Sequence, residues 1–313
     1  MGKITRIPNE PRMGRRDTVA LPSLSETWRT KDAPYHERGT AMSDYVHAIN
    51  QIYGQAELSA KLLTALREAG KDLDALTRDD LAVFDEQHGG GREATRELAR
   101  LTGLHAGMHV LDVGSGLGGP ARTLAAEFGC RVTGRDLTEE FCRAAVMLTA
   151  RVGLQERITF QHGSALDLPF EATSFDVVWT QGMLMNIADK PRLFAEAYRV
   201  LRPGGRLAFQ ASLAGPVPGV YYPTFWADDA QLSFLVPPEE CRRLLVATGF
   251  QERAWHDRTP QAGPEEATAA GSPPALGWAV IVATNLEGRI ANMRRNYAEG
   301  RLVQVMAVFE RPA

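Results

Sequence analysis

Glycine residues are concentrated in one short segment, VLDVGSGLGGPAR, which runs from Val110 to Arg122. Its first residues form an apolar run typical of a buried strand, and its last residues begin a helical pattern, so the glycines occupy a strand-to-helix turn. Glycine permits positive φ, and without a Cβ atom it lets a ligand approach the main chain closely. The turn therefore predicts a site for a nucleotide-like ligand, whose contacting residues are Gly114, Ser115, Gly116 and Gly118.

Two acidic residues accompany this turn. Asp112 lies near the end of the same strand, and Asp136 ends the next strand in VTGRDL, 22 positions after Gly114. A carboxylate at the second position can accept hydrogen bonds from both hydroxyls of a ribose. The pair indicates an adenosine-containing ligand, with a dinucleotide and S-adenosylmethionine both open at this point. A Walker loop is excluded because no Gly-Lys-Ser/Thr follows the glycines.

Alternating strand and helix patterns position these residues. From residue 93 onward, helical stretches of about 10 to 15 residues separate the expected strands, which predicts βαβ units and a parallel sheet. The expected strands are HVLDVG, RVTGRDL, RITFQHGSA, FDVVWTQ, RLAFQAS, ERAWHDRT and LVQVMAVF. The fold class is therefore α/β: a Rossmann-like, mostly parallel seven-stranded sheet with helices on both faces, preceded by an N-terminal helical lid.

Composition restricts the class of partner. The 313 residues include 35 Lys and Arg against 38 Asp and Glu, a net charge of −3, which argues against a broad nucleic-acid-binding or membrane-binding surface. The three cysteines form neither a disulfide framework nor a metal-binding pattern, and we find no apolar run of the length of a signal sequence or a membrane span. We expect a cytoplasmic protein with a small-molecule partner, no metal, no nucleic acid and no membrane; a homodimer is left open.

Five segments in this order and spacing, VLDVGSGLGGPAR, VTGRDLTEE, GSALDLPF, FDVVWTQ and RVLRPGGRLAF, resemble the class I S-adenosylmethionine-dependent methyltransferases. The resemblance covers roughly residues 85 to 255. More narrowly, DEQHGGGREATRELA and MNIADK are similar to bacterial small-molecule methyltransferases of the sarcosine/dimethylglycine N-methyltransferase-like group. The resemblance implies S-adenosylmethionine as the cofactor and methyl transfer as the reaction, so the enzyme class expected is EC 2.1.1.

The family pattern also implies roles for single residues. The loop from Gly114 to Gly118 would lie along the methionyl and ribose parts of the cofactor, and Asp112 would sit below it near the cofactor's amino group. Asp136 would hold the ribose diol. Gln181, after the fourth strand, would contact the cofactor and face the methyl-transfer channel. The adenine would be lined by Leu137, Ser164, Ala165 and Leu166.

With the resemblance, the chain divides into three parts. Residues 1–35 are expected as a flexible tail and residues 36–92 as the helical lid, with a helical pattern from 42 to 70 and a second helix capped by Thr77. Residues 93–313 are expected as the S-adenosylmethionine-binding methyltransferase domain. A stretch rich in Pro, Gly and Ala predicts an insertion around 260–278.

Methyl transfer needs little acid–base chemistry, because the sulfonium already activates the methyl carbon and the enzyme mainly aligns the nucleophile. An amine or phenol acceptor would benefit from a base, so His88 and His256 are candidate catalytic residues beside Gln181. An aromatic cluster follows the fifth strand in GPVPGVYYPTFWADD, and aromatic faces favour cations. The expected acceptor-site residues are Tyr53, Met185, Asn186, Tyr221, Tyr222 and Trp226.

The function predicted is methyl transfer to a small molecule, with an amine or amino-acid nitrogen as the first expectation. O-methylation of a phenol, S-methylation of a thioether, C-methylation and non-catalytic binding of S-adenosylmethionine are the alternatives. A nucleic-acid methyltransferase is disfavoured because no Asp/Asn-Pro-Pro-Tyr/Phe follows the fourth strand.

Overall fold

The computed structural model describes residues 47, 49–50, 53–86, 88–259, 280–281 and 285–313. The expected tail at 1–35, the first part of the expected lid and the whole expected insertion at 260–278 lie outside the described residues.

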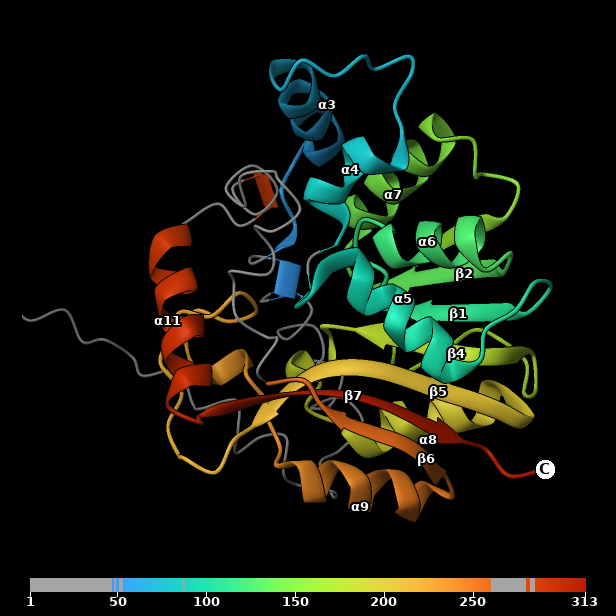
Figure 1. Ribbon diagram of the computed structural model, residues 1–313, viewed down its shortest axis with the longest axis vertical. Helices are drawn as coiled ribbons and strands as arrows, with labels where there is room; N and C mark the ends of the chain where they lie inside the picture. Colours follow the sequence, from blue (N-terminus) through green and yellow to red (C-terminus); the bar gives the residue numbers. More distant parts are fainter. Residues whose placement is uncertain (1–46, 48, 51–52, 87, 260–279, 282–284) are drawn as a thin grey trace, which may run out of the picture.

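A seven-stranded sheet organises the described chain, in the order β3-β2-β1-β4-β5-β7-β6 (Figure 1). The five strands β3, β2, β1, β4 and β5 run parallel, whereas β7 is antiparallel to both of its neighbours. This confirms the expected mostly parallel α/β sheet. The strands are β1 (His109–Val113), β2 (Arg131–Asp136), β3 (Ile158–His162), β4 (Phe175–Gln181), β5 (Leu201–Ala214), β6 (Gln251–Asp257) and β7 (Leu302–Glu310).

The central strands are apolar on both faces because helices cover both sides of the sheet. In β1, Val110 packs into one apolar cluster and Leu111 into the opposite one. In β4, Trp179 and Val178 divide in the same way. Successive side chains of a strand point to opposite faces, so an uninterrupted apolar run is what a strand between two helical layers requires.

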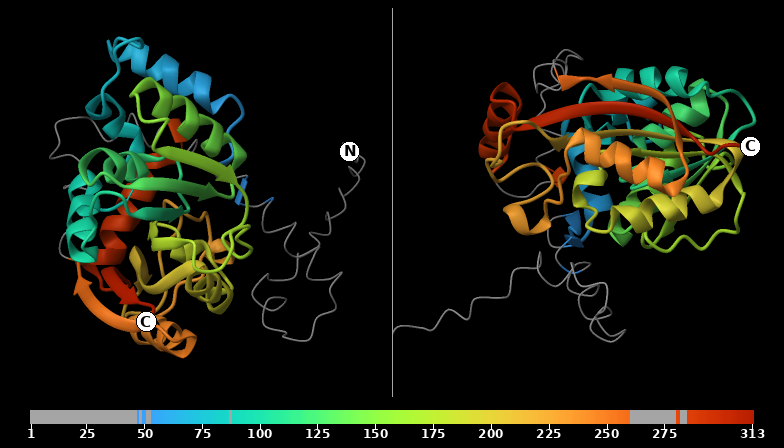
Figure 2. Two further views of the ribbon diagram at one scale, coloured as in Figure 1. Left: turned by 90° about the vertical axis from the view of Figure 1, so that its right-hand side faces the viewer. Right: turned by 90° about the horizontal axis from the view of Figure 1, so that it is seen from below.

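Helices α5 (Gly91–Thr102) and α6 (Gly119–Glu127) form one layer with the first cluster, and α8 (Lys190–Val200) and α9 (Pro238–Thr248) form the other (Figures 1 and 2). Helix α6 begins at the glycine turn, so its first residues lie at the carboxyl end of β1. Helix α11 (Leu286–Ala298) precedes β7.

An N-terminal helical part packs beside this sandwich. Helices α3 (Leu58–Glu68) and α4 (Arg78–Asp85) join α7 (Glu139–Arg151) in a third apolar cluster. The expected cap of α4 is present: Thr77 Oγ1 accepts a hydrogen bond from the Asp80 main-chain nitrogen, and the Asp80 carboxylate accepts one from Thr77.

The helical pattern from 42 to 70 is interrupted in the structure. The Gly54 nitrogen donates to Asn50 O at 2.7 Å, the last bond of a helical turn, and residues 54–57 are not helical. Glu57 then adopts a φ of 58° before α3 begins. Glycine ends helices readily, so the helix break lies at Gly54. The apolar periodicity continues on both sides of this residue and therefore did not indicate the break.

Within the described ranges, every helix is too short or too polar to cross a membrane.

Candidate active site

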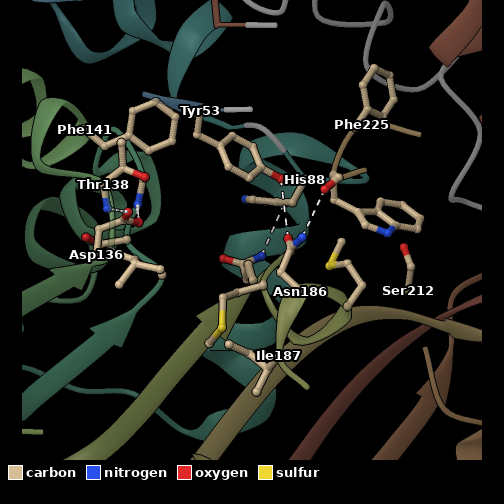
Figure 3. A pocket seen from close by; sticks show the side chains of 18 of the residues that line it. Tyr53, His88, Asp136, Thr138, Phe141, Asn186, Ile187, Ser212 and Phe225 are labelled. Carbon is tan, nitrogen blue, oxygen red and sulfur yellow. Dashed lines mark hydrogen bonds between the residues drawn. The ribbon is translucent and has the colours of Figure 1, made fainter. Parts of the chain in front are cut away.

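A cavity of about 290 Å³ lies where four parallel strands end. Its walls include the residues that directly follow β1, β2, β3 and β4, which are Gly114, Leu137, Gly163 and Gly182. The carboxyl ends of the strands are the usual ligand-binding edge of an open α/β sheet. Figure 3 shows Asp136 at one end of the cavity, Ser212 and Phe225 at the other, and His88 and Asn186 between them.

The glycines of the turn have two different roles: one packs against the sheet, and another lines the cavity. Gly118 has a φ of 84°, and a Cβ atom there would lie 2.6 Å from the Phe160 ring, so this glycine packs against β3 and does not line the cavity. Gly116 has a φ of 52° and nothing within 4 Å of an added Cβ, and it lines the cavity. The main chain at Gly116 is therefore open to the cavity, as the sequence predicts for contact with a bound cofactor.

The carboxylate of Asp136 is fixed by the main chain of two turns. Its Oδ2 accepts a hydrogen bond from the Gly116 nitrogen at 2.8 Å, and its Oδ1 accepts one from the Thr138 nitrogen at 2.9 Å. Burial raises the pKa of this carboxyl, although both hydrogen bonds act to lower it. A carboxylate has about four acceptor positions, so both oxygens can still accept hydroxyl protons from the cavity side.

Asp112 lies below the turn, is only 1% exposed and does not line the cavity. Its Oδ2 finds no hydrogen-bond partner among the described residues. Burial raises the pKa of this carboxyl to about 8, and the charges of Asp136 and Glu86 act in the same direction. A buried carboxylate oxygen without a partner is costly, and a ligand cation placed beside it would relieve that cost.

The expected adenine-side residues reach the cavity. Leu137, Ser164, Ala165 and Leu166 all line it, and Ser164 Oγ accepts a hydrogen bond from the Leu166 nitrogen at 3.1 Å. Thr138 and Phe141 line the same end, although sequence reasoning did not select them (Figure 3).

Gln181 is the centre of a buried hydrogen-bond network at the middle of the cavity. Its Oε1 accepts from Trp179 Nε1 at 3.0 Å and from Thr95 Oγ1 at 3.1 Å. Its Nε2 donates to Gln210 Oε1 at 2.8 Å and lies 3.4 Å from His88 Nδ1. The side chain at the end of β4 is therefore held in one orientation by partners from three other segments.

His88 lines the cavity and pairs with a carboxylate that sequence reasoning missed. Its Nε2 lies 3.1 Å from Glu86 Oε2, and the two side chains are only 5% and 4% exposed. Burial acts to raise the pKa of the Glu86 carboxyl, but the hydrogen bond and charge of His88, with Arg92 and Thr123, outweigh it and hold the pKa below its usual value. The carboxylate thus orients the imidazole that faces the cavity.

Most of the expected acceptor-site residues also line the cavity: Tyr53, Met185, Asn186 and Trp226. Tyr53 Oη donates to Asn186 Oδ1 at 3.5 Å, and Asn186 Nδ2 donates to Trp226 O at 3.0 Å. These bonds join the N-terminal helical part to the loop after β4 and the loop after β5 (Figure 3).

Besides Asp112 and Gly118, three expected catalytic or acceptor-site residues do not line the cavity. His256 is exposed on β6, the outer strand of the sheet, where it pairs with Met306. The Tyr221 ring lies against the guanidinium groups of Arg295 and Arg301, at 3.8 and 4.4 Å. Tyr222 packs behind the cavity wall, in the cluster that contains Trp226.

No group of three or more His, Cys, Asp and Glu side chains that could hold a metal ion is found in the part of the chain that the structure describes.

Comparison with known proteins relates this chain to methyltransferases. Residues 111–209 match a family model described as a methyltransferase domain. The 27-O-demethylrifamycin SV methyltransferase of Amycolatopsis mediterranei (strain S699) is 36% identical over 152 residues, 47% of this chain and 56% of that one. The sarcosine/dimethylglycine N-methyltransferase of Halorhodospira halochloris is 34% identical over 155 residues, 49% of this chain and 55% of that one. The chain thus spans about half the length of these two relatives.

The fold extends further than the sequence match. A crystal structure of geranyl diphosphate C-methyltransferase from Streptomyces coelicolor A3(2) is 19% identical, with a TM-score of 0.63, and the match covers 85% of this chain and 98% of that one. At this identity the likeness concerns the fold alone.

The family match, the sheet order and the cavity at the strand ends agree with one another. Residues 111–209 form a methyltransferase domain, which confirms the resemblance to class I S-adenosylmethionine-dependent methyltransferases seen in the sequence. S-adenosylmethionine is the cofactor of this class, as expected. The residues present fit it, since Gly116 offers open main chain and both oxygens of Asp136 keep acceptor positions toward the cavity.

Proposed function

We propose that the protein transfers the methyl group of S-adenosylmethionine to a small-molecule acceptor that lies beside His88. The observation that carries this proposal is the division of one cavity into two ends, with Asp136 at one, Ser212 and Phe225 at the other, and His88 between them (Figure 3). A reaction between two bound molecules needs this arrangement, because holding both in contact supplies most of the rate.

The cofactor end would use the main-chain turn and three sets of side chains. Asp136 would accept the ribose hydroxyls with the lone pairs that Gly116 and Thr138 leave free. Asp112 would lie below the turn, near the amino group of the cofactor but outside the cavity wall. The adenine would contact Leu137, Phe141, Ser164, Ala165 and Leu166. When bound, S-adenosylmethionine supplies a methyl group on a positively charged sulfur.

His88 would act as the base. Glu86 Oε2 accepts the proton on Nε2, so the lone pair is on Nδ1, 3.4 Å from Gln181 Nε2. In place of that contact, Nδ1 would take a proton from the acceptor as the new bond to the methyl group forms. The protonated Nδ1 would then have Gly89 O at 3.4 Å as its partner. Glu86 is a positioning residue in this scheme, since it acts through His88. The amine nitrogen expected from the narrower resemblance and a hydroxyl oxygen can both lose a proton in this way.

The proposal is tested in two stages. Calorimetry with S-adenosylhomocysteine tests the cofactor end, and the absence of binding would refute the proposed function. Release of S-adenosylhomocysteine from S-adenosylmethionine is then measured with a panel of amines, phenols and thioethers. Binding of the cofactor without transfer to any member would favour the non-catalytic alternative.

The role of His88 is tested with His88→Gln and with His105→Gln as the matched control, because His105 is an exposed histidine outside the cavity. We expect kcat to fall by about 10²- to 10⁴-fold for His88→Gln, the usual contribution of a base, and to stay unchanged for the control. An unchanged kcat for His88→Gln, or an equal loss in His256→Gln, would overturn this assignment.

A further inference from the structure

Three neutral polar side chains meet at the end of the cavity opposite Asp136. They are Ser212 from β5, Tyr297 from α11 and Gln304 from β7, and all three line the cavity. Ser212 Oγ lies 2.7 Å from Tyr297 Oη, and Gln304 Oε1 accepts hydrogen bonds from Tyr297 Oη at 2.6 Å and from Ser212 Oγ at 3.1 Å. We call these residues the polar anchor. The proposed function gives none of them a role.

The hydrogen bonds of the anchor leave one group free. In the structure, Gln304 Oε1 faces the two hydroxyl groups, which turns the amide nitrogen away from them. Among the described residues, Gln304 Nε2 has no hydrogen-bond partner. Its two N–H groups are therefore available to an oxygen atom of a bound molecule.

This free amide lies close to the segment that carries His88. A Cβ atom added to Gly89 would lie 3.8 Å from Gln304 Nε2. Gly89 O in turn accepts a hydrogen bond from Gln210 Nε2 at 2.7 Å, and Gln210 Oε1 accepts a hydrogen bond from Gln181 Nε2. The anchor and the proposed base therefore belong to the same compartment of the cavity.

The charges around this compartment restrict what it can hold. Apart from His88, the cavity is lined by three charged side chains among the described residues: Arg135, Asp136 and Arg294. Arg135 and Asp136 are at the cofactor end, and Arg294 is exposed. The described part of the compartment thus offers no carboxylate to an ammonium group and only an exposed guanidinium to a carboxylate. Burying an uncompensated charge there would be costly.

The rest of the compartment is mainly apolar, with Tyr53 and Asn186 as further polar residues. Its apolar lining residues include Ile49, Met185, Phe225, Trp226, Ile290 and Met293. Such a surface favours an apolar or aromatic body with a small number of polar groups, which is the usual lining of a small-molecule site.

We propose that Gln304, held by Ser212 and Tyr297, binds a carbonyl or other hydrogen-bond-accepting oxygen of the acceptor, and that the acceptor is an uncharged, largely apolar molecule whose hydroxyl group faces His88. This inference rests on the proposed function and names its substrate class. It selects a neutral hydroxyl compound over the zwitterionic amino acid that the narrower resemblance suggests.

The experiment uses matched probes on the full chain. The 2′-, 3′- and 4′-hydroxyacetophenones carry a carbonyl oxygen, and the corresponding ethylphenols have nearly the same shape without it. Binding to protein saturated with S-adenosylhomocysteine is measured by calorimetry for each pair. One good hydrogen bond is worth about 1 kcal/mol, so we expect at least one ketone to bind about five- to tenfold more tightly than its ethyl partner.

Two variants test whether Gln304 is the cause. Gln304→Met removes the amide at similar volume, and we expect it to abolish the preference for the ketone while leaving the affinity for the ethylphenol unchanged. Gly89→Ala keeps every hydrogen bond of the anchor and adds a methyl group 3.8 Å from Gln304 Nε2, so it should reduce the same preference. A purely structural role of Gln304 would change both affinities equally.

Three outcomes would overturn the inference: no preference for any ketone in the wild-type protein, a preference that survives in both variants, or tighter binding of sarcosine than of every phenol. These outcomes are distinct from failure of the proposed function, which would appear as loss of S-adenosylhomocysteine binding to the wild-type protein.

Discussion

The buried carboxyl of Asp112 leads to a prediction with two opposite effects in one variant. Burial raises its pKa from the ordinary value of 3.8 to about 8, so between these pH values the native state holds a proton that the unfolded chain has lost. Stability therefore falls as pH rises through this window. Asp112→Asn keeps the shape and removes the titration, so the variant should be more stable than the wild-type protein at neutral pH.

The magnitude follows from the shift. Each pH unit inside the window removes about 1.4 kcal/mol from the free energy of unfolding of the wild-type protein. Between pH 5 and pH 7 the stability difference between variant and wild type should therefore grow by about 2.5 kcal/mol. Most other titrating groups are shared by the two proteins and cancel in this difference.

The same substitution, Asp112→Asn, should weaken cofactor binding although it stabilises the cofactor-free protein. A ligand ammonium beside Asp112 stabilises its charged form, so Asp112→Asn should weaken S-adenosylhomocysteine binding by about 1.5 to 3 kcal/mol, the value of a hydrogen bond to a charged group. Urea denaturation of the cofactor-free proteins at several pH values measures the first effect, and calorimetry at pH 7 measures the second. A stability difference that does not change with pH would refute the buried neutral carboxyl, and an unchanged Kd would refute its place near the cofactor's amino group.

Two further predictions concern the same end of the cavity. Asp136→Ala should weaken S-adenosylhomocysteine binding by about 1.5 to 3 kcal/mol, and an unchanged Kd in calorimetry would exclude the ribose role. Gly116→Ala should cost the cofactor-free protein only about 1 kcal/mol, because the added Cβ meets open space and the cost is that of a positive φ, yet it should impair S-adenosylhomocysteine binding strongly. Gly107→Ala is the control, since Gly107 has a φ of 88° and open space but lies outside the cavity; equal Kd values for the two variants would contradict the assignment.

Local patterns were sufficient to predict the fold. The glycine turn, the acidic residue after the second strand and the alternation of strands and helices each lie within a short window of sequence, so the βαβ order could be read along the chain. The same windows selected Asp136 and Gln181, which line the cavity. Their roles in binding and catalysis stay predictions.

The missed residues depend on contacts between distant segments. Ser212 and Gln304 are 92 positions apart and meet because β5 and β7 pair antiparallel, which no spacing rule indicates. Glu86 meets His88 through a loop conformation, without helical or strand periodicity. The two histidine candidates were equivalent in the sequence, and the structure separates them because His88 lines the cavity whereas His256 is exposed on β6.

The two ends of the cavity are encoded by different stretches of the chain. The matched segment 111–209 supplies the turn, Asp136 and the adenine-side residues, whereas the polar anchor and Trp226 all follow it. An evolving gene can therefore alter one recognition surface by substitutions downstream of residue 209 and inherit the other intact. A chimaera that joins residues 1–209 of this chain to the downstream part of a relative would keep the cofactor-side residues and exchange the polar anchor and Trp226, whereas Tyr53, His88, Met185 and Asn186 would remain.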